Sequence, residues 1–177
     1  MTEPRWALVV GASRGLGLGL AAELKSRGWN VVGTVRDAAG ERRLQKLAET
    51  PGGEIRAEHL DINDDAQIAA LRRRLDGLEF DLVFVNAGIS PQGRGDAAGA
   101  SRDEAAAVFM TNAVAPMRVP YTFLDRLRSG PGIIAFMSSG SAASPTKPTA
   151  TARSTAPARR RSIHCRAAWL LRSAAGG

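Results

Sequence analysis

The sequence predicts an α/β fold with a doubly wound parallel sheet, and three observations lead to this prediction. Short runs rich in β-branched residues alternate with helical patterns up to about residue 140. A glycine-rich segment directly follows the first of these runs. The 177 residues, 44% of them hydrophobic and 23% charged, suffice to bury the core of one such domain.

The alternation gives the expected elements in chain order. Strands are expected at 6–10, 30–35, 54–60, 80–86 and 132–137. Helices are expected at 16–27, 40–49, 64–76 and 102–127, the last with a bend at Pro116 or Pro120. The turn-rich stretch 88–99 follows the fourth strand, on the side of a parallel sheet where ligands bind.

The composition changes abruptly after Gly140. All 17 acidic residues precede residue 126, whereas residues 141–177 carry seven of the 24 basic ones, so the net charge of +7 belongs to this segment. We therefore expect a folded domain at 1–140 and a basic, Ala/Ser/Arg-rich irregular tail at 141–177. A tail that binds nucleic acid or an acidic partner is an alternative, disfavoured because Trp169 is its only aromatic residue.

Other classes of protein are excluded by simple features of the sequence. The single Cys165 rules out an internal disulfide, and two histidines with one cysteine predict no metal site. No apolar run could cross a bilayer, and the chain begins with a short strand instead of an export signal. A cytoplasmic protein that does not enter a membrane is therefore expected.

The first predicted strand leads into a glycine turn, Gly11-Ala12-Ser13-Arg14-Gly15-Leu16-Gly17, which opens a helix. Glycines permit a tight turn and let backbone N–H groups approach a pyrophosphate, and the helix N-terminus adds partial positive charge. This arrangement is typical of Rossmann-type dinucleotide sites. An ordinary glycine-rich turn is the alternative, which the strand–turn–helix context disfavours.

The end of the second predicted strand indicates which dinucleotide binds. In such folds an acid at this place binds the ribose 2′-OH of NAD, or an arginine binds the 2′-phosphate of NADP. Arg36 stands at the exit and Arg14 lies inside the glycine turn, so the sequence favours NADP. Asp37, the next residue, leaves NAD as the alternative.

Four further blocks follow the glycine turn along the chain: Asp61, Asn86-Ala87-Gly88, Asn112 and Ser138-Ser139. Over about residues 5–141 the chain thereby resembles the short-chain dehydrogenase/reductase family, above all its NADP-dependent carbonyl reductases. The resemblance implies hydride transfer between NADPH and a small carbonyl or alcohol substrate. It also implies a homo-oligomer for an intact member, whereas the family's later strands and helices are missing here.

The resemblance assigns a role to each matching residue. The pyrophosphate and adjacent ribose would lie against Gly11, Ser13, Arg14, Gly15, Leu16 and Gly17. The 2′-phosphate would bind Arg36, the adenine would lie beside Asp61 and Ile62, and the central ribose would follow Asn86, Ala87 and Gly88. Catalysis would involve Asn112, which would hold a water, and Ser139, which would bind the substrate oxygen. Strand-end hydrogen bonding for Asn86 and a helix bend for Asn112 are the structural alternatives.

The family's proton donor is absent from this chain. The family uses a tyrosine whose pKa is lowered by a lysine four residues later, but the only tyrosine, Tyr121, precedes the fifth strand and is followed by Asp125. The only lysine after Ser139 is Lys147. We therefore expect little or no turnover, and a catalytically silent module that binds a dinucleotide is the alternative function.

Regrouping the codons of the tail recovers the missing block. The residue largely fixes the first two bases of its codon and leaves the third, the wobble base, free. If the frame is read one nucleotide earlier, each new codon consists of the preceding wobble base and these two fixed bases. Thr155 can then be read as tyrosine and Arg159 as lysine. The codons of residues 160–163 can continue as alanine, alanine, leucine and asparagine. We hypothesise a one-base change of frame between about Gly140 and Thr155, with a genuine basic extension as the alternative.

Overall fold

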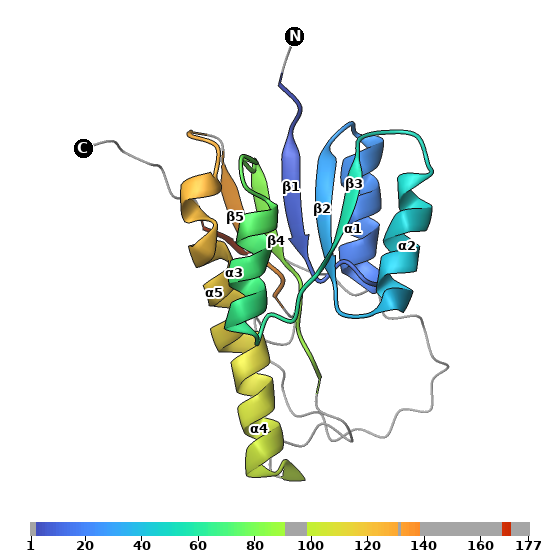
Figure 1. Cartoon of the computed structure of the whole chain (residues 1–177). Coiled ribbons are helices and arrows are strands. Elements are labelled where there is room, and N and C mark those ends of the chain that lie inside the picture. The colour runs from blue at the N-terminus through green and yellow to red at the C-terminus, as the bar shows by residue number, and fades with distance from the viewer. Residues whose placement is uncertain (1–2, 91–98, 131, 139–167, 171–177) are drawn as a thin grey trace, which may run out of the picture.

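The strands of the protein form one twisted sheet (Figure 1). A computed structural model describes residues 3–90, 99–130, 132–138 and 168–170. Their strands are β1 (Trp6–Val10), β2 (Asn30–Val35), β3 (Ile55–His59), β4 (Leu82–Val85), β5 (Ile133–Phe136) and β6 (Ala168–Leu170). The spatial order is β3-β2-β1-β4-β5-β6, with the first five strands parallel. The predicted doubly wound α/β fold is confirmed.

Helices connect the parallel strands. They are α1 (Gly15–Ser26), α2 (Ala38–Ala48), α3 (Asp65–Arg74), α4 (Arg102–Phe109) and α5 (Ala115–Thr122), with a π-helix at Met110–Val114 and a 3₁₀ turn at Leu124–Arg126. Side chains of Asp37, Asp64 and Ser101 accept backbone N–H bonds at the starts of α2, α3 and α4. The N–H groups of Gln67 and Ala66 help to hold the pKa of the Asp64 carboxyl below its ordinary value.

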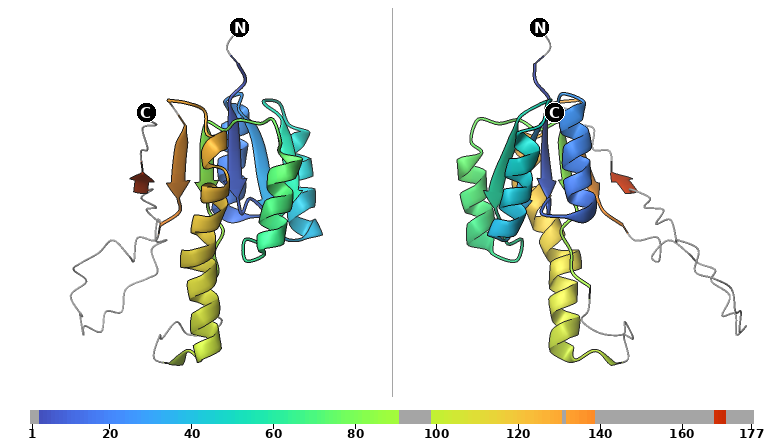
Figure 2. Two further views of the ribbon diagram at one scale, coloured as in Figure 1. Left: turned by 60° about the vertical axis from the view of Figure 1, so that its left-hand side comes forward. Right: turned by 90° about the vertical axis from the view of Figure 1, so that its right-hand side faces the viewer.

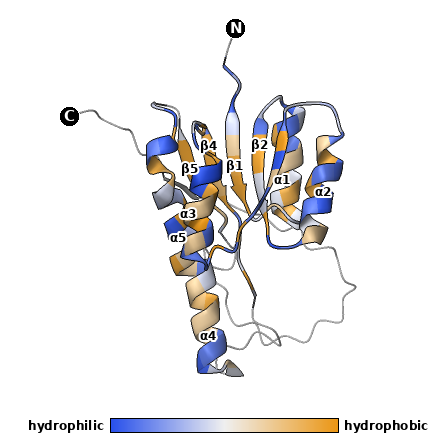
Figure 3. Ribbon diagram, in the orientation of Figure 1, coloured by the Kyte–Doolittle hydropathy of each residue, from blue (hydrophilic) through white to orange (hydrophobic). Residues whose placement is uncertain are grey.

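Alternating side chains of the strands bury two apolar layers. Leu8 and Val10 of β1 pack with α3 and α5 on one face, while Ala7 and Val9 pack with α1 and α2 on the other. Figure 2 shows these helix pairs on opposite sides of the sheet. Orange hydrophobic segments accordingly concentrate in the central strands (Figure 3). The core fixes the carboxyl ends of β1 to β4 relative to one another.

The predicted long helix at 102–127 is divided in the structure. The π-helix Met110–Val114 joins α4 to α5 and lies just ahead of Pro116, and the bend expected at Pro116 or Pro120 stays a prediction. Pro116 has no N–H for the carbonyl of Asn112, and the helix accommodates this one turn earlier by widening. None of the residues of α4 is buried, and α4 continues past the carboxyl ends of the strands (Figure 2).

One element of the tail differs from the expected irregular structure. Residues Ala168–Leu170 form β6, which pairs antiparallel with β5. Three residues give no measurable alternation, so the sequence carried no signal for this strand. Its pairing satisfies backbone groups at an edge of β5 that would otherwise be open.

Candidate functional site

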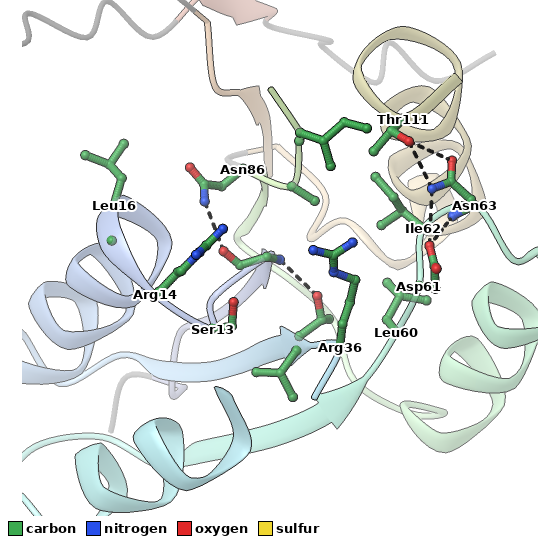
Figure 4. A pocket seen from close by; sticks show the side chains of 17 residues that line it. Ser13, Arg14, Leu16, Arg36, Leu60, Asp61, Ile62, Asn63, Asn86 and Thr111 are labelled. Carbon is green, nitrogen blue, oxygen red and sulfur yellow. Dashed lines mark hydrogen bonds between the residues drawn. The ribbon is translucent and has the colours of Figure 1, made fainter. Parts of the chain in front are cut away.

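A pocket of about 330 Å³ lies at the carboxyl ends of β1 to β4 (Figure 4). Eleven of the twelve residues predicted for the cofactor line it: Gly11, Ser13, Arg14, Gly15, Leu16, Arg36, Asp61, Ile62, Asn86, Ala87 and Gly88. The twelfth, Gly17, is buried just behind them. Residues that sequence reasoning did not select also line it: Thr34, Val35, Leu60, Asn63, Ile89 and Thr111. The structure thus brings together residues from five separate segments.

The glycine turn packs too tightly for side chains at two of its positions. Gly11 has φ +86°, and a Cβ there would lie 2.8 Å from the backbone of Ala87. A Cβ on Gly17 would lie 2.1 Å from the carbonyl oxygen of Gly11. The first turn of α1 is therefore pressed directly against the end of β1, where its amides reach the pocket.

Two side chains from neighbouring strands fix the glycine turn. The N–H of Gly11 donates to Oγ1 of Thr34 at 3.0 Å, and Nδ2 of Asn86 donates to the carbonyl of Gly11 at 3.0 Å. Asn86 therefore both lines the pocket and makes the strand-end hydrogen bond that the structural alternative expected. These bonds orient the turn before any ligand arrives.

The N-terminus of α1 has no acidic side chain of its own. Arg14 occupies the cap position with extended backbone and makes no side-chain cap bond, and the first turn of α1 holds no acid. First-turn N–H groups of a helix have no intrahelical acceptor, and they carry partial positive charge. An anion is the natural acceptor for them.

The charges around the pocket favour a strongly anionic ligand. Arg14 and Arg36 both extend into it (Figure 4), and Asp61 is the only acid among its lining residues. Asp37 faces elsewhere, because its carboxylate accepts the N–H of Gly40 at 2.6 Å and caps α2. Asp37, which had kept NAD as the alternative cofactor, therefore caps α2 and does not line the pocket.

The π-helix links two loops at the edge of the pocket. Oδ1 of Asn112 accepts the N–H of Ile89 at 2.8 Å, and its Nδ2 donates to the carbonyl of Ile89 at 2.7 Å. The preceding residue, Thr111, accepts a bond of 3.1 Å from Nδ2 of Asn63. Asn112 does not line the pocket, and its predicted role in holding a water stays a prediction.

Replacing Asn112 by alanine should destabilise the fold. Two hydrogen bonds to Ile89 are lost, each worth about 0.5–1.5 kcal/mol. Urea unfolding should therefore show a free energy of unfolding lower by about 1–3 kcal/mol. Lys46→Ala, at an exposed side chain on α2, is the control and should change this free energy little. Equal effects of both substitutions would contradict the role assigned to Asn112.

Of the groups considered for catalysis, Ser139 lies outside the described residues and Tyr121 lies away from the pocket. Ser139 lies outside the described residues, and its neighbour Ser138 follows β5. Tyr121 is 78% exposed on α5 and lines a separate depression with Asp65 and Arg118. Asp125, four residues on, pairs with Arg72 at 2.7 Å. Tyr121 therefore has no access to the pocket as a proton donor.

The described part of the chain contains neither a cluster of metal-ligating side chains nor a candidate membrane span. There, no three His, Cys, Asp or Glu side chains gather as they would around a metal ion. No helix in that part has the length and apolarity to traverse a bilayer.

Known proteins resemble this chain in sequence and fold. The family model for short chain dehydrogenases matches residues 5–152. Human 17-beta-hydroxysteroid dehydrogenase type 1 is 34% identical over 132 residues, which are 71% of this chain and 40% of the human protein. The 3-oxoacyl-[acyl-carrier-protein] reductase FabG of Escherichia coli is 36% identical over 90 residues, 50% of this chain and 36% of FabG.

Solved structures extend the likeness to three dimensions. A short-chain dehydrogenase/reductase from Burkholderia multivorans with bound NADP has 44% identity and a TM-score of 0.72, over 78% of this chain and 60% of that one. A carbonyl reductase from Pseudomonas aeruginosa PAO1 in complex with NADP has 38% identity and a TM-score of 0.72, over 79% and 60%. This chain thus spans only part of the length of its relatives. From the match over residues 5–152, the chain belongs to the short chain dehydrogenase family.

Proposed function

We propose that the chain derives from an NADP-preferring oxidoreductase that transfers hydride between NADPH and a small carbonyl or alcohol substrate. The observation that carries this is the pocket itself. The N-terminal N–H groups of α1 lie at this pocket together with Arg14 and Arg36, whereas the Asp37 carboxylate caps α2. Bound NADP in the two solved relatives supports the same choice of cofactor.

The lining residues fit the chemistry of this cofactor. The close contacts at Gly11 and Gly17 hold the first turn of α1 against the end of β1, and a pyrophosphate would lie against the amides of that turn. Two guanidinium groups suit a dianionic 2′-phosphate because each can donate two parallel hydrogen bonds. Asp61 and Ile62 would border the adenine, and Asn86 the central ribose. When bound, the nicotinamide supplies or accepts the hydride.

Turnover by this polypeptide should be impaired. The developing charge on the substrate oxygen would meet Ser139, but no tyrosine with a lysine four residues later is present. General acid catalysis contributes about 10²–10⁴ in rate. The family match ends at residue 152, inside the region where we place the change of frame, and this supports that hypothesis.

A catalytically silent cofactor-binding module is the second candidate. The same pocket and the absence of the tyrosine–lysine block favour it. Oxidation of NADPH that depends on an added ketone, above the rate without protein, would support the enzyme. Binding of NADPH without such oxidation would support the silent module.

We also infer that the homo-oligomer implied for an intact family member would use the side of α4 and α5. Four large apolar side chains are exposed along these helices and the π-helix between them: Phe109, Met110, Met117 and Tyr121. The division into a domain at 1–140 and a tail at 141–177, and the cytoplasmic location, stay predictions from the sequence. The tail's alternative role as a nucleic-acid arm falls almost entirely outside the described residues.

Arg36 provides the direct test of the proposed cofactor. Arg36→Gln removes a charge from the pocket, and charge-assisted hydrogen bonds are worth about 1.5–3 kcal/mol. Titration of NADPH fluorescence should show affinity about 10–100-fold lower, with NADH affinity nearly unchanged. The exposed Arg73→Gln on α3 is the charge-matched control. Saturable NADPH binding that Arg36→Gln leaves intact would contradict the assignment.

A further inference from the structure

Arg43, on the exposed side of α2, contacts the glycine turn across 30 positions of sequence. Its Nη1 donates to the carbonyl oxygen of Ser13 at 3.1 Å. Ser13 and its neighbour Arg14 both line the pocket. Arg43 could not be selected from the sequence, because its contact with Ser13 depends on how α2 packs.

The packing of α2 against the turn is close and defined. A Cβ added to Gly40 would lie 2.6 Å from Cβ of Ser13 and 3.1 Å from Cβ of Val35. Gly40 and Arg43 are three positions apart on one helix and therefore share a face. The cap at Asp37 fixes where this helix begins. The Arg43 side chain is thus held beside the turn by a rigid element.

Acidic groups near Arg43 are already paired. The Asp37 carboxylate accepts the N–H of Gly40, and the Glu41 carboxylate lies 3.0 Å from Nε2 of His59. A guanidinium has five N–H donors, of which the bond to Ser13 uses one. Among the described residues, that bond is the one hydrogen bond of Arg43, and Arg43 itself lies outside the lining of the pocket, next to Ser13.

Resting on the proposed function, we propose that Arg43 is a third cationic group for the 2′-phosphate and a specificity-determining residue for NADP. It acts in two ways. Its bond to Ser13 occupies a carbonyl oxygen that would otherwise repel a phosphate, and its charge adds to those of Arg14 and Arg36. Its exposure means that salt should weaken the contribution.

The test compares Arg43→Gln with Arg42→Gln in the full chain. Arg42 is the adjacent residue on the same helix and is equally classed as exposed, so it controls for net charge and helix position. Affinities are measured for adenosine 2′,5′-bisphosphate and adenosine 5′-monophosphate, which differ by the 2′-phosphate alone. Competition against NADPH fluorescence gives both values at low and moderate salt.

Arg43→Gln should raise the Kd for the bisphosphate about 5–30-fold and the Kd for the monophosphate less than about twofold. Arg42→Gln should change both little, and Arg43→Lys should restore part of the preference because it retains the charge. Equal weakening of both nucleotides by Arg43→Gln would reduce Arg43 to a support of the turn and overturn the proposal. So would equal effects of Arg42→Gln and Arg43→Gln. Failure of the unaltered chain to bind NADPH would instead refute the proposed function.

Discussion

A chain whose frame is corrected by one base, so that the tyrosine–lysine block follows β5, should reduce a ketone with NADPH at least about a hundredfold faster than the present chain. The reason is the proton that the substrate oxygen must receive as hydride arrives. In the present chain the only tyrosine, Tyr121, lies exposed on α5 away from the pocket. A tyrosine beside a lysine supplies that proton at neutral pH.

The measurement is NADPH oxidation at 340 nm with a panel of small ketones. The corrected chain with its restored tyrosine changed to phenylalanine is the matched control, because it keeps the corrected reading frame and lacks only the proton donor. It should bind NADPH as the corrected chain does and turn over at least about a hundredfold more slowly. Nucleotides across codons 140–172 that spell no such block in any frame would contradict the frame hypothesis.

Gly17→Ala should sharply reduce NADPH affinity and stability together. A single methyl group would lie 2.1 Å from the carbonyl of Gly11 and 2.8 Å from Nδ2 of Asn86, so α1 must move away from the turn. Such overpacking costs about 1–3 kcal/mol, and the displaced amides can no longer meet the pyrophosphate. We expect NADPH affinity to fall by more than about tenfold.

Gly19→Ala is the matched control for this substitution. It lies two residues further along α1, with no atom within 4 Å of an added Cβ. Alanine there should stabilise the helix by about 0.5–1 kcal/mol and leave NADPH affinity unchanged. Urea unfolding and fluorescence titration of the two variants give both quantities. NADPH binding by Gly17→Ala as tight as that of the unaltered chain would refute the assigned role of the turn.

Local signals in the sequence predicted most of the architecture. The bounds expected for β1 and β2 match the structure, because both strands are rich in valine and almost all of their residues are buried. The fourth strand is shorter than expected, since Phe80 lies in an isolated bridge to Leu127 instead of the ladder. Periodicity detects burial, and it does not detect where hydrogen bonding of the ladder ends.

The site was predictable where a motif is contiguous and not where distant segments meet. The glycine turn and Arg36 follow from spacing along the chain, and a cap at Asp37 could have been inferred from an acid just ahead of a helical pattern. The hydrogen bonds that Asn63 donates to Thr111 and Ile89 donates to Asn112 join residues 48 and 23 positions apart. They depend on the π-helix, for which the sequence offers no periodic signal.

A crystal structure of the chain grown with NADPH tests the central claim most directly. The account predicts the pyrophosphate against the amides of residues 15–17 and the 2′-phosphate between Arg14 and Arg36. An ordered domain without cofactor at the glycine turn, from crystals held in millimolar NADPH, would contradict it.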